Sequence, residues 1–251
     1  MFLRAKMKEI TVNATYLLCF MCLVILVQGV SISQCGLSER NEWIGIMLHG
    51  LDTKWRDWNV NCVLLWLLPQ ISAFLFYSVC IGEQIRNMYL ELPRLQSWNR
   101  WWWKLQKTTI QYAVCFAGIV CVVVWISFVL LGTEGKHMEL NKVVMLCFPA
   151  ILYYFLQLYI YMQLQMMFQI CFRQARAAII FVFLIEIIGM YTGAQISRMH
   201  CWIIGSNSMW KRYGVLHSNT PDRWIGFLGL LICNVSIAIF TKLYLKKRTE
   251  I

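Results

Sequence analysis

Charged residues are scarce in this chain. Only 14% of its 251 residues are Asp, Glu, Lys or Arg, whereas 59% are hydrophobic and the mean hydropathy is +0.57. A soluble domain carries about 25% charged residues. The composition therefore argues against an ordinary soluble enzyme or binding domain and indicates a protein that places apolar surface in lipid.

Motifs for nucleotide binding, metal binding and catalysis are also missing. The glycine-to-lysine spacing in GTEGKH, residues 132–137, is wrong for a phosphate-binding loop. The four histidines, His49, His137, His200 and His217, are scattered without the spacing of metal ligands. No Ser-His-Asp set and no pair of carboxylates stands where it would perform acid–base chemistry. The sequence predicts no enzymatic activity, no metal and no cofactor in this chain.

The 11 cysteines lie mostly inside apolar runs. Cys19 and Cys22 have the spacing of a ligand pair, but no histidine stands near them, so we interpret them as buried apolar residues. Cys35 and Cys201 are predicted to lie outside the membrane. They would be able to pair in an oxidising compartment, although nothing in the sequence fixes the distance between them.

Long runs that are nearly free of charge indicate membrane spans, which must be helical because lipid offers no partner to backbone groups. The sequence contains six such runs and no hydrophilic domain longer than about 30 residues. The predicted fold is thus an all-α integral membrane protein with one transmembrane domain over residues 1–251. The predicted spans are 12–32, 60–82, 109–132, 143–172, 177–194 and 223–245, and the predicted extracellular loops are 33–59 and 195–222.

Basic residues predict the orientation of these spans. Groups of Lys and Arg precede the first span, lie between the second and third and between the fourth and fifth, and follow the sixth. An even number of spans places all these groups, and both termini, on the cytoplasmic side. The net charge of +11 is then mainly a topology signal, and we expect a lipid bilayer as partner and no nucleic acid.

The segment PRLQSWNRWWWKLQK, residues 93–107, lies between the second and third spans. On a helical wheel its apolar and basic side chains fall on opposite faces, which predicts an amphipathic helix on the cytoplasmic surface, with tryptophans in the lipid. An interfacial anchor and a docking helix for a cytosolic partner are both open interpretations. The apolar face holds Trp98, Trp101, Trp102 and Leu105, and the basic face holds Arg100, Lys104 and Lys107.

Tryptophans also mark the two long outer loops. They are typical of side chains at headgroup depth, and we expect them to form contacts at the outer face. The residues concerned are Trp43, Trp55, Trp58, Trp202 and Trp210.

Glu186 is the clearest ionisable residue deep inside a predicted span. A carboxyl costs a few kcal/mol there, so it should face a cavity or a partner. It is either a substrate-contact or gating residue or a structural carboxyl, protonated or bonded to another helix. Gln157, Gln165 and Gln169 in the fourth span either line a polar path with it or form hydrogen bonds between helices.

Three stretches of the sequence resemble the permease subunits of ABC-type-2 transporters, and more narrowly the small six-span permeases beside bacteriocin and lantibiotic clusters in Gram-positive bacteria. The stretches are residues 58–107, residues 202–212, where Ile204 replaces the usual proline, and the basic tail YLKKRTEI. The positions that match in the first stretch are Trp58, Asn59, Pro69, Glu83, Arg86, Arg94, Ser97 and Trp101.

This resemblance implies a subunit of the bacterial cytoplasmic membrane that exports or expels a peptide-like or amphipathic substrate. It implies a second permease subunit, identical or related, and separate cytosolic ATP-binding subunits that hold the ATP and Mg. The loop between the second and third spans would form the coupling helix on the ATPase. The coupling residues that it implies are Glu83, Arg86, Arg94, Ser97, Trp98, Arg100 and Trp101.

Two other functions are open from the sequence. A non-transporting immunity or sensor protein that binds a peptide outside would use the tryptophan-rich outer loops. A secondary transporter would use Glu186, although the chain shows neither paired intramembrane charges nor inverted repeats.

Overall fold

The described part of the chain is a bundle of long helices. The computed structural model describes residues 60–88, 91–92, 97–131, 140–195 and 220–249. Every regular element in these ranges is a helix, as the sequence predicts. The helices are α3 (Val60–Arg86), α5 (Trp98–Leu131), α6 (Leu140–Phe172), α7 (Ala175–Gln195) and α10 (Thr220–Thr249).

Three of these helices contain segments long and apolar enough to cross a membrane, namely Trp98–Val122, Ala175–Thr192 and Ile225–Tyr244. The chain therefore has the character of a membrane protein. The helices α3, α6, α7 and α10 coincide with predicted spans to within a few residues at most ends. The predicted span 12–32, the loop 33–59 and nearly all of the loop 195–222 lie outside the described residues.

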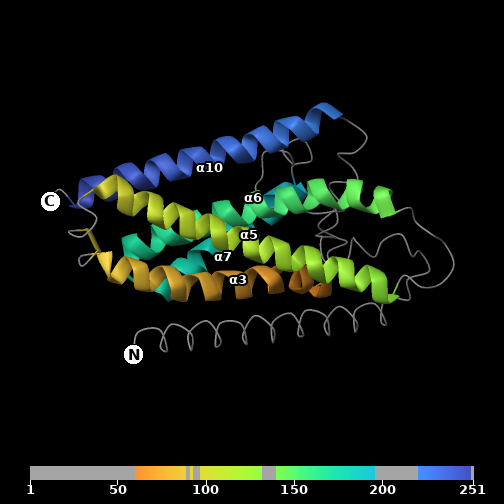
Figure 1. Ribbon diagram of the computed structural model, residues 1–251, viewed down its shortest axis with the longest axis horizontal. Coiled ribbons are helices and arrows are strands. Elements are labelled where there is room, and N and C mark those ends of the chain that lie inside the picture. The colour runs from red at the N-terminus through yellow and green to blue at the C-terminus, as the bar shows by residue number, and fades with distance from the viewer. Residues whose placement is uncertain (1–59, 89–90, 93–96, 132–139, 196–219, 250–251) are drawn as a thin grey trace.

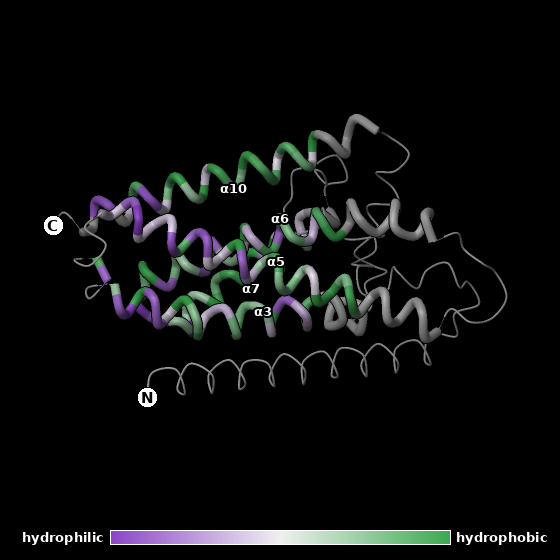
Figure 2. Tube along the Cα trace, viewed as in Figure 1, coloured by the Kyte–Doolittle hydropathy of each residue, from purple (hydrophilic) through white to green (hydrophobic). Residues whose placement is uncertain are grey.

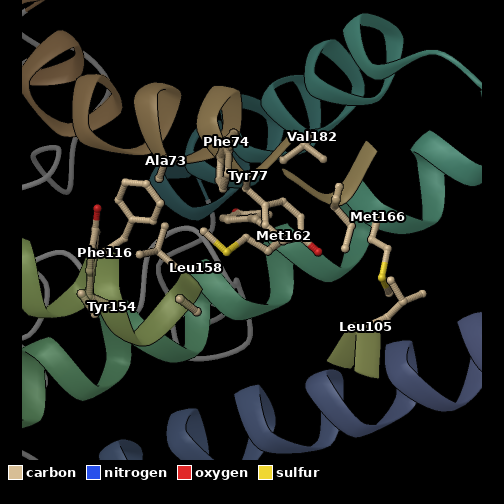
Figure 3. Packing of buried hydrophobic residues seen from close by; sticks show 14 of the residues in the cluster. Ala73, Phe74, Tyr77, Leu105, Phe116, Tyr154, Leu158, Met162, Met166 and Val182 are labelled. Carbon is tan, nitrogen blue, oxygen red and sulfur yellow. The ribbon is translucent and has the colours of Figure 1, made fainter. Parts of the chain in front are cut away.

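The helix α6 lies at the centre of the described bundle. It packs against α3, α5, α7 and α10, and α3 also packs against α5 and α7. In Figure 1, α10 runs along one edge of the bundle and α3 along the opposite edge. Side chains from α3, α5, α6 and α7 converge in one core, part of which is seen in Figure 3.

The α6–α7 connection is a two-residue turn. The helix α6 ends at Phe172, and Arg173 adopts a left-handed conformation with φ of 56°, as residues that follow a helix often do. The carbonyl of Gln174 then accepts the N–H of Ala178 at 3.3 Å and begins α7. The rings of Phe172 and Phe181 stack across the turn at 4.9 Å. This short basic turn thus joins α6 and α7, which are adjacent and antiparallel.

Basic side chains gather at one end of the bundle. The end of α3, the start of α5 and the end of α10 meet there, and Figure 2 shows hydrophilic residues on all three. This grouping agrees with the common side that the sequence predicts for these residues. The exposed basic residues at this end are Arg86, Arg100, Lys104, Lys107, Arg173, Arg176, Lys246 and Lys247.

Two glutamines join α6 to α3. The side-chain amide of Gln165 donates to the carbonyl of Phe74 at 2.8 Å, and that of Gln169 donates to the carbonyl of Ser78 at 3.3 Å. Gln165 and Gln169 are four residues apart on α6, as Phe74 and Ser78 are on α3. The two parallel helices therefore form one such hydrogen bond per turn and keep the same register. Gly82 gives Gln169 its room, since a Cβ at this position would lie 2.6 Å from the amide nitrogen.

We therefore predict that Gly82→Ala displaces the Gln169 amide and lowers the free energy of unfolding by about 1 kcal/mol, the scale of a hydrogen bond between membrane helices. Gly118→Ala is the matched control, because a Cβ there meets no atom within 4 Å. Thermal unfolding in detergent measures both variants.

A second comparison isolates the cause. In a Gln169→Ala background the Gly82→Ala change should cost little, because the amide that it displaces is gone. Equal losses with and without Gln169 would show that Gly82 acts through another contact.

Candidate functional site

The segment 98–107 is the beginning of the long helix α5, whose stretch Trp98–Val122 is long and apolar enough to cross a membrane. It runs without a break into the predicted span 109–132, so that α5 has 34 residues. The hydroxyls of Thr108 and Thr109 turn back within this helix and donate to the carbonyls of Lys104 and Leu105. From Trp98 on, the segment expected to form a surface helix is thus continuous with the following helix, whereas residues 93–96, with Arg94, lie outside the described part.

The tryptophan face of this segment packs against the bundle. Trp101, Trp102 and Leu105 are at most 3% exposed and belong to the main core. Trp98 packs at the edge of that core, with its ring 5.0 Å from the ring of Trp101. The sequence is right that these residues share a face, but the expectation that the face contacts lipid is wrong, because the neighbouring helices supply the apolar surface. Figure 3 shows Leu105 next to Met166 of α6.

The opposite face of the same turns is exposed. Arg100, Lys104 and Lys107 are exposed, and Lys104 forms an ion pair with Glu91 at 2.7 Å. A pair this exposed adds little stability, but it ties the end of the α3–α5 connection to α5. The first turns of α5 thus carry a basic outer face and a buried inner face.

The other coupling residues implied by the resemblance lie at the same end. Glu83 and Arg86 are exposed in the last turns of α3. Ser97 precedes α5, and its carbonyl accepts the N–H of Trp101 at 3.3 Å, which is the position of an N-cap residue. The structure therefore brings all of these residues except Arg94, which it does not describe, to one end of the bundle.

Glu186 lies fully buried on α7. Neither of its oxygens forms a hydrogen bond with good geometry to a described residue, although the side chain of Gln70 on α3 lies close enough to interact with it. Tyr154 and Tyr161 of α6 also interact electrostatically with the carboxyl. Sequence reasoning identified Glu186 but missed Gln70. The feature that could have drawn attention to Gln70 is its polar amide next to Pro69, inside an apolar helix.

Gln157, Gln165 and Gln169, for which the sequence leaves open a polar path or hydrogen bonds between helices, are all buried on α6. Gln165 and Gln169 hold α3, as described above, so their contacts are those of helix-joining residues. Gln157 is buried at an earlier turn of α6. The path interpretation is untested by these contacts.

A second polar cluster joins α5 to α6. The hydroxyl of Tyr159 donates to Oε1 of Gln106 at 2.7 Å, and the amide of Gln163 lies 3.4 Å from the same oxygen. Sequence reasoning missed Gln106, although it lies one turn from Trp102 and so belongs to the buried face of the segment. The hydroxyls of Tyr77 and Thr109 pair at 2.8 Å and add a polar contact between α3 and α5.

The tryptophans predicted to form contacts at the outer face are not among the described residues. Trp43, Trp55, Trp58, Trp202 and Trp210 are outside the described residues, as are Cys35 and Cys201. Within the described helices Cys115, Cys121, Cys171 and Cys233 are free thiols.

Comparison with known proteins adds no relative. No family model matches the chain, and neither the curated proteins nor the solved structures contain a match.

We predict that Trp101→Ala lowers the free energy of unfolding by about 3–5 kcal/mol, the cost of emptying a large buried site. Trp103→Ala is the matched control, because this neighbouring indole is 66% exposed; it should change stability by less than about 0.5 kcal/mol. Thermal unfolding of both variants in lipid nanodiscs measures these two changes in stability. Equal effects would mean that the tryptophan face is not part of the core.

Proposed function

We propose that this chain is the transmembrane permease subunit of an ATP-driven transporter of the ABC-type-2 kind. It works in the bacterial cytoplasmic membrane with six spans and both termini in the cytoplasm. It exports or expels a peptide-like or amphipathic substrate. ATP and Mg are bound by a separate cytosolic subunit, and a second permease subunit completes the assembly.

The single observation that carries this proposal is the construction of the first turns of α5. At about 1.5 Å per residue a helix of 34 residues is about 51 Å long, far more than the ~30 Å hydrocarbon core. Its first turns can therefore project from the membrane at the basic end of the bundle. A force applied to these turns passes along an unbroken helix.

The two faces of these turns fit the role of a lever. A partner finds an exposed basic surface at Arg100, Lys104 and Lys107. The opposite face is fixed in the core by Trp101, Trp102 and Leu105. Because dense cores transmit displacement rather than absorb it, movement of a docked partner would reach α3 and α6 directly.

Charge also favours an acidic partner at this end. The exposed side chains of Arg86, Arg173 and Arg176 lie at the same end of the bundle as the first turns of α5. The short α6–α7 turn supplies a second contact for the same partner. Complementary charge steers such an encounter and fixes its register.

The test is co-purification with the products of the neighbouring genes, followed by an ATPase assay. We expect an ATPase to co-purify, and Arg100→Glu to reduce its retention at least about tenfold, because placing like charges across an interface costs several kcal/mol. Arg100 is exposed, so the variant should fold normally.

Lys247→Glu is the matched control. This variant reverses an exposed charge on α10, at the same end of the bundle, and leaves the first turns of α5 unchanged. Equal loss in both variants would point to general electrostatic adhesion. If no ATPase co-purifies with the unmodified chain, the permease function fails and a non-transporting immunity or sensor protein becomes the better account.

A further inference from the structure

Glu186 is the only acidic side chain that is fully buried within the described helices. It lies near the middle of α7, inside the segment Ala175–Thr192 that can cross a membrane. Its two carboxyl oxygens are covered, yet neither forms a hydrogen bond of good geometry there. A carboxylate in this position would have lost its water and gained no adequate replacement.

No described cation faces this carboxyl. Among the described helices, α3 and α6 pack against α7. They present Gln70, Tyr154 and Tyr161 to it, all uncharged in their ordinary forms. The hydroxyl of Tyr77 is turned to Thr109 of α5 instead.

The nearest basic residues along these helices are distant. On α7 itself Arg176 is ten positions away, which is about 15 Å along the axis. On α3 the basic residue of the described stretch is Arg86, sixteen positions beyond Gln70 and thus about 24 Å along the axis. The described side chains of α6, from 151 to 172, include no Lys, Arg or His.

The predicted first span does not supply a cation either. Residues 12–32 contain no Lys, Arg or His. A charged Glu186 would therefore be an isolated ion in an apolar medium, which proteins avoid by neutralising the group. A neutral acid carries no charge that needs solvation, so protonation removes most of the cost of burying this carboxyl beside Gln70, Tyr154 and Tyr161.

We propose that Glu186 is a proton-binding site that is occupied in the packed bundle and released when the bundle opens to water. On binding, one proton passes from hydronium to a carboxylate oxygen and leaves water. On release, water takes the proton back and solvates the carboxylate. No other reactant is needed.

Proton binding then biases the conformation of the bundle. The packed state holds one proton more than a state in which the carboxyl is hydrated and charged. By linkage, raising the pH favours the hydrated state and lowering it favours the packed state. The contacts of Gln70 with α7 and of Gln165 with α3 lie on the helices that would separate, so the proton would set how readily this part of the bundle opens.

This inference rests on the packing of α3, α6 and α7 and does not require the proposed transport function. The chain alone, purified in nanodiscs without any ATPase, is sufficient for its test. A negative result for Glu186 would not change the meaning of the co-purification. A negative co-purification would likewise not change the meaning of the result for Glu186.

The first experiment is infrared spectroscopy of the full chain at neutral pH. We expect the carbonyl stretch of a protonated carboxylic acid in a dry environment. Glu186→Gln should abolish this band, and Glu83→Gln should leave it, because Glu83 is exposed on α3. Absence of the band, or its survival in Glu186→Gln, overturns the proposal.

The second experiment measures thermal unfolding between about pH 6 and about pH 9 for the same three proteins. One extra proton in the folded state should lower the melting temperature of the unmodified chain by about 3–6 °C per pH unit relative to Glu186→Gln. Glu83→Gln should follow the unmodified chain. Parallel curves for the unmodified chain and Glu186→Gln would show that no proton is bound at this site.

Discussion

The structure depends on the hydrogen bonds that buried glutamines of α6 form with neighbouring helices away from water. This helix packs against four others, and its glutamines are buried. In lipid, apolar side chains gain little by leaving their surroundings, so helices associate through close packing and hydrogen bonds between them. The amides of Gln165 and Gln169 therefore do more than fill space, since they reach the backbone of α3 and fix its register. Gly82 is required on the facing helix for the same reason.

The same helix positions both parts of the candidate site. On one side α6 receives the buried face of α5 through the Gln106 cluster. On another side Tyr154 and Tyr161 stand around Glu186 of α7. The basic first turns of α5 and the buried carboxyl of α7 are thus connected through one central helix. A shift of α5 would be expected to change the surroundings of Glu186 through α6.

Much of the fold was predictable because apolar runs and basic clusters act locally. The run 143–172 ends where α6 ends, at Phe172, and a two-residue turn follows before α7 begins. The helical wheel of 98–107 correctly separated the two faces. It did not show which face meets the bundle, because a wheel contains no information about neighbouring helices. For the same reason the sequence identified Glu186 but not Gln70, whose importance arises only when α3 meets α7.

The boundary between the surface segment and the third span was also beyond sequence reasoning. Lys104 and Lys107 suggested that the membrane span begins after them, which is a statement about polarity rather than about the backbone. The backbone of α5 nevertheless stays helical from Trp98 to Leu131, with Lys104 and Lys107 inside it. Polarity and backbone continuity are different properties, and only the first is visible in a hydropathy pattern.

The central claim is that the first turns of α5 are one rigid piece with the bundle. Hydrogen exchange of the backbone amides in lipid nanodiscs tests it most directly. The account predicts that the amides of Trp101–Gln106 exchange as slowly as those of Ala113–Val120 in the same helix, because both stretches have faces in the core. Rapid exchange at Trp101–Gln106 beside slow exchange at Ala113–Val120 would contradict the account, since a frayed segment cannot transmit movement to α6.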